Sequence, residues 1–457
     1  MSTVTSFRPG TRRNVELALL LLAITIVLMA YLNVGLAMDG KFPPDLVKYG
    51  FGLLVLSVGF HLVLRWRASY ADPLMLPIAT LLNGLGLVMI HRLDLAYGRT
   101  GNRLLEPKQL IWSALAMLIA AGVIIVLRDH RQLRRFTFTA MALGLGMLLL
   151  PLVPGIGRNI NGSRIWIGIG PMSFQPGEVA KILLVIFFAG YLVQTRDVLS
   201  LVGRRFMGIG LPRAQDLGPI LIAWLASLGV LVFEKDLGSS LLFFGVFVAM
   251  LYVATERRSW IAIGLLLFCA GSYVAYLLFG HVQQRVMLWL DPFNPAMSDQ
   301  VAKGLMGMAK GGLLGSGLGR GHPEITYFPE SDFIVPSFGE EIGLIGLFAL
   351  LLLYVLLVER GLRTALGVRD GFGKLLAVGL SFSMALQCFV VVGGVTRVIP
   401  LTGLTMPFLS YGGSSLLANW SLVAILLRIS DQARRPLPDS EELATASAAH
   451  TQVVRTQ

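Results

Sequence analysis

The chain has 457 residues, of which 55% are apolar and only 14% are charged. Soluble globular proteins carry about 25% charged residues, so this composition excludes an ordinary soluble enzyme and indicates an integral membrane protein. The net charge of +12 comes from 38 Lys and Arg against 26 Asp and Glu. In a membrane protein the placement of this charge matters more than its sum, and we expect no nucleic-acid partner. The two cysteines and six histidines show neither a disulfide framework nor metal-ligand spacing.

Twelve apolar runs are long enough to cross a bilayer, because a spanning helix needs about 20 mostly apolar residues. The sequence therefore predicts an all-α fold, a polytopic membrane helical bundle. The runs lie near 16–38, 48–64, 73–90, 109–127, 137–153, 178–194, 217–233, 237–254, 260–280, 341–358, 375–393 and 411–427. The segment 281–340 has no spanning run and is too long for a simple connector, so we predict one large extracytoplasmic loop there.

Arginine clusters give the predicted orientation. With the N-terminus in the cytoplasm, several clusters fall in cytoplasmic segments, as the positive-inside rule requires. They include Arg65 and Arg67, Arg134 and Arg135, and Arg257 and Arg258. We therefore expect a multi-pass protein of the cytoplasmic (inner) membrane with both termini in the cytoplasm. The tail 431–457 is expected to be a disordered cytoplasmic segment.

Glu178 and Lys181 are the first candidate site residues. They lie three residues apart at the beginning of the predicted span 178–194, so their side chains share one helix face. One interpretation is an intrahelical ion pair at the membrane interface. The other is that the pair faces an outer cavity and contacts a charged substrate, since ionisable residues at membrane depth are usually functional.

Two further features lie between predicted spans. Asp236 precedes Leu-Gly-Ser-Ser and can either cap the next helix or take part in catalysis. The segment 310–321 contains six glycines but lacks the Gly-Lys-Ser/Thr ending of a phosphate-binding P-loop. We expect it to be a close-approach loop against a sugar or diphosphate rather than a nucleotide site.

Asp332 is the strongest candidate for a catalytic group. It lies between aromatic and β-branched residues just outside a predicted span. Partial desolvation there would raise its pKa from about 3.9 and make it a candidate general base, with helix capping as the alternative. The neighbouring Glu340 and Glu341 are explained by the dipole at a helix N-terminus.

The stretch 400–415 interrupts the apolar pattern with two prolines and several small polar residues. Non-helical backbone at membrane depth is tolerated only where it is buried in protein or lines a cavity. Arg397 precedes this stretch on the predicted outer side, against the charge bias. It is either an interfacial anchor or a cation for a lipid-linked phosphate.

Several of these motifs, in this order, resemble those of the SEDS family (shape, elongation, division and sporulation), which includes RodA and FtsW. The resemblance covers about residues 72–428. The matching motifs are Gln175-Pro-Gly-Glu-Val-Ala-Lys181, Asp236-Leu-Gly-Ser239, Arg285 followed by Leu290-Asp-Pro292, Ser331-Asp-Phe-Ile334, Gly339-Glu-Glu-Ile-Gly343 and Pro407-Phe-Leu-Ser-Tyr-Gly-Gly-Ser-Ser415.

The resemblance implies a peptidoglycan glycosyltransferase that polymerises lipid II at the outer face of the membrane during cell elongation. It implies a ten-span core at 71–430, with 1–70 as an N-terminal addition similar to actinobacterial RodA members. The essential family aspartate falls on Asp332. The substrate-binding residues are expected to be Glu178, Lys181, Trp166, Arg285, Asp236 and Arg397.

The implied partners are a class B penicillin-binding protein, which is a transpeptidase, and other membrane proteins of the elongation complex. No cofactor is implied with certainty, although the chemistry would admit a divalent cation such as Mg or Mn at the diphosphate. The alternatives are a division-type polymerase like FtsW, a flippase for lipid-linked precursors and a non-catalytic scaffold. A flippase predicts ionisable residues deep within the spans, and the sequence has almost none.

Overall fold

The structure is a computed structural model that describes residues 10–160, 163–169, 172–200, 204–206, 209–211, 229, 236–294 and 299–436. In these residues, 11 helical segments are long and apolar enough to cross a membrane. They correspond to α1 (Arg13–Asp39), α2 (Leu46–Arg67), α3 (Met75–Ala96), α4 (Glu106–Val126), α5 (Thr137–Leu149), α6 (Pro176–Ser200), α8 (Leu237–Thr255), α9 (Ser259–Leu278), α12 (Ile334–Gly367), α13 (Gly371–Val395) and α14 (Gly413–Arg434). The predicted helical membrane bundle is confirmed for eleven of the twelve runs, while 217–233 lies outside the described residues.

The helices α3, α6, α13 and α14 form the centre of the bundle and are mostly buried. The helix α9 lies at the edge of the bundle and is almost entirely exposed. Helices suit this environment because all their backbone hydrogen bonds are made within one segment, which lipid requires. Trp420 of α14 is fully buried and packs edge-on against Phe60 and Phe408, with ring centroids 5.8 and 5.5 Å away.

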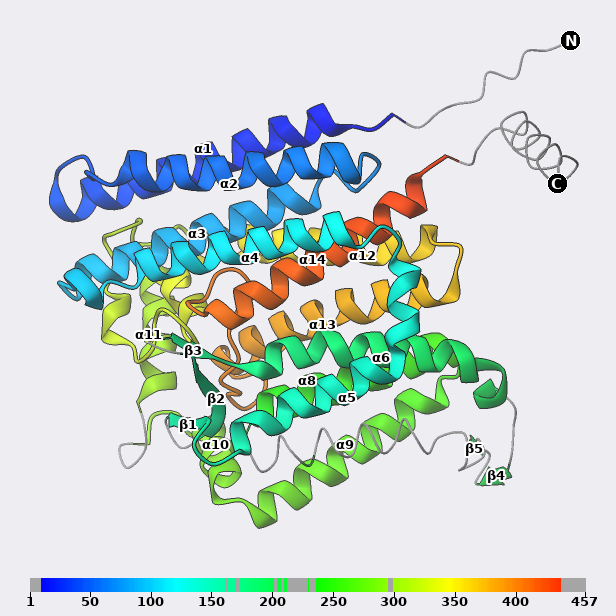
Figure 1. Cartoon of the computed structure of the whole chain (residues 1–457). Coiled ribbons are helices and arrows are strands. Elements are labelled where there is room, and N and C mark those ends of the chain that lie inside the picture. Colours follow the sequence, from blue (N-terminus) through cyan, green and yellow to red (C-terminus); the bar gives the residue numbers. More distant parts are fainter. Residues whose placement is uncertain are drawn as a thin grey trace, which may run out of the picture.

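The two ends of the bundle differ in character (Figure 1). Both described chain ends emerge at one end. There Asp72 accepts hydrogen bonds from Arg360 Nε at 2.9 Å and from Arg434. The amphipathic helices α10 (Gly280–Leu290) and α11 (Gln300–Gly311) lie at the opposite end. The beginning of α1 and the end of α14 therefore lie at the same end of the bundle.

Two small antiparallel sheets were not predicted from the sequence. The strands β1 (Gly157–Ile160), β2 (Ser163–Ile169) and β3 (Met172–Phe174) form a meander in the order β1-β2-β3. Its register places Arg158 opposite Trp166 and Ile167 opposite Phe174. A second hairpin pairs β4 (Arg204–Phe206) with β5 (Ile209–Leu211). Strands this short give a much weaker periodic signal than the flanking apolar spans.

The helix α12 begins seven residues before the predicted span and is broken at Gly343 (φ 68°, ψ −175°). The glycine-rich segment packs against this break. Leu344 N donates to Gly312 O at 2.9 Å, and Gly317 N donates to Glu341 O at 2.9 Å. A Cβ on Gly343 would lie 2.2 Å from the backbone nitrogen of Gly315. The predicted close approach therefore exists, and the backbone that comes close is that of α12; contact of this loop with a sugar or diphosphate stays a prediction.

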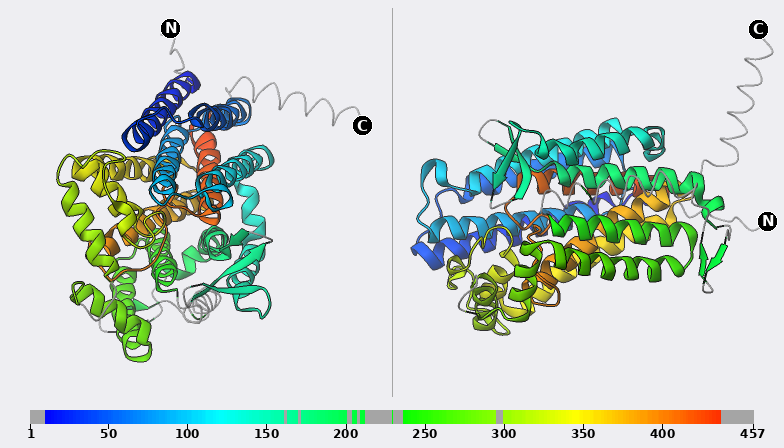
Figure 2. Two further views of the ribbon diagram at one scale, coloured as in Figure 1. Left: turned by 90° about the vertical axis from the view of Figure 1, so that its left-hand side faces the viewer. Right: turned by 90° about the horizontal axis from the view of Figure 1, so that it is seen from below.

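The N-terminal helices α1 and α2 lie along one side of the bundle, next to α3 and α4 (Figure 2). A separate apolar cluster joins them to the rest of the protein. Leu318 from the glycine-rich segment packs against this cluster, whose buried members are Val27, Ala30, Tyr31, Val34, Leu53 and Val88. The pair therefore contacts the segment that leads towards Asp332.

Candidate functional site

Asp332 lies at the entrance to α12, and the backbone on both sides of it is held in place. Ser410 Oγ donates to Ser331 O at 2.7 Å, and Tyr411 N donates to Glu330 O at 2.7 Å. The following Phe333 is fully buried. The Asp332 side chain keeps partial access to solvent, and burial raises its pKa to about 7 against the opposing charge of Arg285. A carboxyl group with this pKa is suited to accept a proton near neutral pH.

Arg285 projects from α10 towards the same place. Its Nη1 donates to Leu401 O at 3.2 Å and to Thr402 O at 2.9 Å. Burial lowers the pKa of Arg285, and the nearby carboxylates of Asp236 and Asp332 oppose this effect. Because backbone carbonyls anchor it, the guanidinium stays close to Asp332 without depending on that residue for its position.

Asp236 caps α8. Its Oδ1 accepts from Ser239 N at 3.0 Å and its Oδ2 accepts from Ser239 Oγ at 2.6 Å. Burial raises the pKa of Asp236, and the bonds from Ser239 oppose this. The capping interpretation is thus confirmed. The cap also lies within electrostatic range of Arg285.

Glu178 and Lys181 form the expected ion pair on α6, with Nζ 2.9 Å from Glu178 Oε2. Both residues are buried. Lys181 Nζ also donates to Gln387 Oε1 of α13 at 2.7 Å, and Gln387 Nε2 donates to Thr405 O at 2.9 Å. Gln387 was not selected from the sequence. The available signal was a single amide inside the apolar run 375–393.

The non-helical segment 401–405 brings these groups together. Arg285 binds its first two carbonyl groups, and Gln387 binds the last one. A Cβ on Gly403 would lie 3.8 Å from both Arg285 Nη2 and Asp332 Oδ2. The candidate site is therefore assembled from α6, α8, α10, α13 and the entrance of α12 around one stretch of irregular backbone. The two prolines in 400–415 predicted the irregular backbone itself.

Arg397 has a different environment. Its backbone is left-handed (φ 62°), its Nη2 donates to Trp289 O at 2.8 Å, and Trp289 Nε1 donates to Arg397 O at 2.9 Å. These reciprocal bonds connect the end of α10 to the loop after α13. The structure thus shows a bracing role for Arg397, while contact with substrate stays a prediction.

Trp166 lies in β2 and is partly buried. The chain after the sheet is attached to α14, because Gln175 N donates to Ser414 Oγ at 2.8 Å. Contact of Trp166 with substrate stays a prediction. Within the described part of the chain, no three His, Cys, Asp or Glu side chains come together as metal ligands.

Comparison with known proteins places this arrangement in a family. The sequence pattern of a cell cycle protein family, that of FtsW, RodA and SpoVE, matches residues 73–435. The chain belongs to this family. The helices α1 and α2 precede the matched residues.

The chain is 50% identical over 432 residues to the peptidoglycan glycosyltransferase RodA of Mycobacterium tuberculosis strain H37Rv, covering 93% of this chain and 92% of that protein. It is 48% identical to the Mycobacterium leprae protein of the same name, over 95% of this chain and 94% of that one. The stage V sporulation protein E of Bacillus subtilis strain 168 is 32% identical, over 86% of this chain and 99% of that protein.

Solved structures agree with this assignment. A crystal structure of the rod shape determining protein RodA of Thermus thermophilus aligns with a TM-score of 0.56 and 25% identity, covering 80% of this chain and 98% of that one. A chain from a peptidoglycan synthase complex, described in terms of coordinated polymerization and crosslinking, aligns with a TM-score of 0.56 and 25% identity over 84% of this chain and 97% of that one.

Proposed function

We propose that the chain is a peptidoglycan glycosyltransferase of the elongation type, which polymerises lipid II into glycan strands at the outer face of the cytoplasmic membrane. The observation that carries this proposal is the partly exposed Asp332, with a pKa of about 7 and with Arg285 beside it. The relatives named peptidoglycan glycosyltransferase RodA support it. With both termini in the cytoplasm, the end of the bundle that carries Asp332 faces outward.

In this proposal Asp332 accepts the proton from the 4-hydroxyl group of the acceptor sugar. The hydroxyl oxygen forms a bond to the anomeric carbon of the donor, and the bond from that carbon to the undecaprenyl diphosphate breaks with inversion. The proton remains on Asp332 until solvent removes it. The leaving diphosphate keeps the electron pair, so negative charge grows there as the reaction proceeds.

Arg285 and Lys181 supply the complementary positive charge. Fixed cations aimed at a developing anion are an effective source of catalysis, because they need no reorganisation during the reaction. Arg285 is anchored by backbone carbonyls. Among the described residues, Lys181 donates to Glu178 and Gln387, and an ammonium group has three donors. The proposal assigns the third donor of Lys181 to the diphosphate.

Polymerisation of lipid II by the purified chain, reconstituted with its transpeptidase partner, tests the proposal. We expect Asp332→Asn to lower the rate at least 100-fold, the usual contribution of a general base. The matched control is Asp299→Asn, which removes an exposed carboxylate from the same outer region and should retain the wild-type rate. A wild-type rate in Asp332→Asn would eliminate the proposed base, and absence of polymer from the wild-type protein would eliminate the activity.

We further propose that a class B penicillin-binding protein docks its single membrane helix against α12 and α13. An apolar groove of about 720 Å³ runs between these helices, and its lining includes Leu351, Val355, Leu362, Phe389 and Val392. It follows the helices over several turns, which suits another helix. Val355→Trp should fill the groove and weaken copurification of the transpeptidase, whereas Leu118→Trp on the exposed face of α4 should not. Equal copurification by both variants would contradict the proposal.

A further inference from the structure

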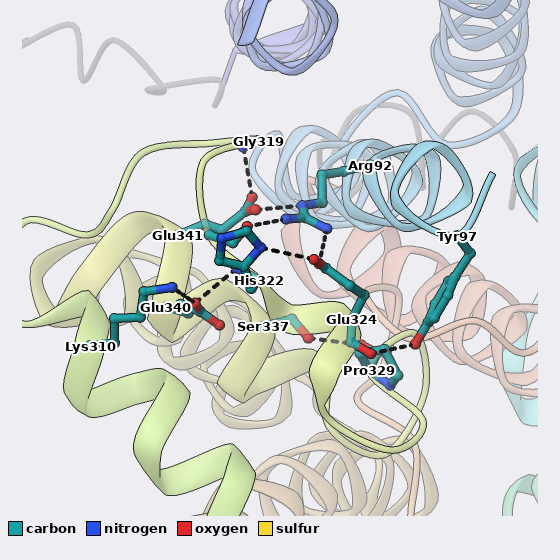
Figure 3. Close-up of polar contacts among 11 residues, drawn as sticks. Arg92, Tyr97, Lys310, Gly319, His322, Glu324, Pro329, Ser337, Glu340 and Glu341 are labelled. Carbon is teal, nitrogen blue, oxygen red and sulfur yellow. Dashed lines mark hydrogen bonds and ion pairs between the residues drawn. The ribbon is translucent and has the colours of Figure 1, made fainter. Parts of the chain in front are cut away.

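A buried arginine on α3 lies at the centre of the contacts that hold the Asp332 segment. Arg92 is 1% exposed. Its Nε donates to Glu341 Oε1, its Nη1 to Glu324 Oε2 and its Nη2 to Gly321 O, each at 2.5 Å (Figure 3). Arg92 was not among the residues predicted from the sequence.

The three partners of Arg92 flank Asp332 in the sequence. Gly321 and Glu324 precede it, and Glu341 follows it in the first part of α12, just before the break at Gly343. One guanidinium therefore attaches both sides of the segment 321–341 to α3. A planar guanidinium has five donors in fixed directions, and an ammonium group cannot reproduce this geometry.

Other contacts make the same segment rigid. Glu341 Oε2 accepts from Gly319 N at 3.0 Å, and Tyr97 OH, directly after α3, donates to Glu324 O at 3.0 Å. Ser337 Oγ donates to Pro329 O at 3.1 Å (Figure 3). The part of α12 before its break is thus joined to the preceding loop, and a shift at Arg92 would be transmitted to Asp332.

We propose that Arg92 is a positioning residue for glycosyl transfer, which fixes the segment 321–341 to α3 and so sets the place of the Asp332 carboxylate relative to Arg285 and Gly403. This inference rests on the proposed function. It has a kinetic consequence, because displacement of a catalytic group by about 1 Å costs on the order of 100-fold in rate.

The test is Arg92→Lys in the full chain, assayed for lipid II polymerisation with the transpeptidase partner present. We expect kcat to fall at least tenfold while KM stays within about twofold, because substrate contacts are kept. The rate should rise with pH as Asp332 ionises, and we call this rising part of the pH profile its acidic limb. In Arg92→Lys the acidic limb should move to lower pH. A loosened segment admits water to Asp332, and its pKa then falls towards its ordinary value while the charges of Arg285, Asp236 and Glu330 around it remain.

The matched control is Arg428→Lys at the opposite end of the bundle. Arg428 is also buried, and it donates to Arg67 O at 2.6 Å and to Asp431 Oδ2 at 3.4 Å. Its loss tests destabilisation without any change at the site. We expect this variant to keep the wild-type pH profile, and to keep kcat within twofold once the folded fraction is taken into account.

The outcomes separate clearly. If Arg92→Lys kept the wild-type kcat and the wild-type acidic limb, the inference would be overturned. A lower rate with the acidic limb at its wild-type position, as expected for Arg428→Lys, would overturn it as well. If Arg92→Lys fails to fold, Glu324→Ala removes one acceptor of Arg92 from a less buried position, and we expect about a threefold loss of kcat with a limb shift in the same direction. An unshifted limb in that variant would also overturn the inference. Absence of polymer from the wild-type chain would instead contradict the proposed function.

Discussion

The carboxylate of Asp332 and the guanidinium of Arg285 meet at one glycine. A Cβ on Gly403 would lie 3.8 Å from Asp332 Oδ2 and 3.8 Å from Arg285 Nη2. Arg285 is held by the two carbonyl groups that precede this glycine, so its charge acts on Asp332 from a fixed place. A positive charge near a carboxylate lowers its pKa and burial raises it. The resulting value of about 7 leaves Asp332 able both to accept and to release a proton.

Gly403→Ala tests this relationship. The new methyl group would contact both side chains, and the left-handed backbone at Gly403 (φ 78°) disfavours alanine by about 1–2 kcal/mol. We expect at least a tenfold loss of polymerisation rate with a modest fall in melting temperature. The control is Gly122→Ala on α4, where a Cβ meets nothing within 4 Å and helix propensity improves. Full activity in Gly403→Ala would show that the spacing between Asp332 and Arg285 does not matter.

The pH dependence of the rate follows from the pKa of Asp332. The proposed base works only when ionised, so kcat/KM should rise with pH up to about 7 and level off above it, with a slope that corresponds to one proton. The measurement is the initial rate of lipid II polymerisation between pH 5.5 and 8.5 at low substrate concentration. A rate that stays flat from pH 5.5 upward would contradict a base with this pKa.

Ionisation of Asp332 should also change the stability of the protein. The free energy of unfolding should fall with rising pH, whereas the rate rises. Because folding raises the pKa of Asp332 from 3.8 to about 7, its contribution to the free energy of unfolding falls as pH rises from about 4 to about 7. The full shift corresponds to about 4 kcal/mol, which partial exposure reduces to about 1–2 kcal/mol. Asp332→Asn should therefore melt a few degrees above wild type at pH 8 and show a smaller gain at pH 5. An equal gain at both pH values would mean that ionisation of Asp332 is not the cause.

Sequence reasoning located eleven of the spans among the described residues, for a physical reason. Apolar runs must cross lipid, which makes the spans easy to recognise, and the matching motifs drew attention to Glu178, Lys181 and Asp332. The same reasoning failed where the signal is three-dimensional. Nothing in the run 375–393 shows that Gln387 reaches both Lys181 and Thr405.

The glycine-rich segment 310–321 shows what amino-acid composition can and cannot predict. Its composition correctly indicated that a backbone approaches closely, but composition does not identify what approaches. Gly315 faces the backbone of Glu341 and Gly343, so the glycines serve the break in α12. Arg92 was missed for a similar reason, since its partners Gly321, Glu324 and Glu341 are far away in the sequence and close only in the fold.

Gln387→Leu tests the link between α13 and the site. The substitution removes the acceptor of Lys181 and the donor to Thr405 O. The buried ammonium of Lys181 loses one partner at about 1–3 kcal/mol, and the partly buried carbonyl of Thr405 loses one at a smaller cost. We expect a loss of polymerisation of at least tenfold and a lower melting temperature. Ser381→Ala on the same helix removes a buried hydroxyl that has no hydrogen-bond partner among the described residues, so it should be neutral or stabilising. If Gln387→Leu matched Ser381→Ala in activity, Gln387 would have no role in positioning Lys181.

Leu318→Ala tests whether the N-terminal helices support the site. Leu318 packs against the cluster that includes Val27, Tyr31 and Val34, while Gly319, the next residue, donates from its backbone to Glu341. Truncating a packed leucine costs about 2–5 kcal/mol at a fully buried position, and less here because Leu318 is only partly buried. We expect a few-fold loss of kcat, which Leu314→Ala, at an exposed position in the same segment, should not show. Equal rates in the two variants would mean that α1 and α2 pack against the core without supporting the Asp332 segment.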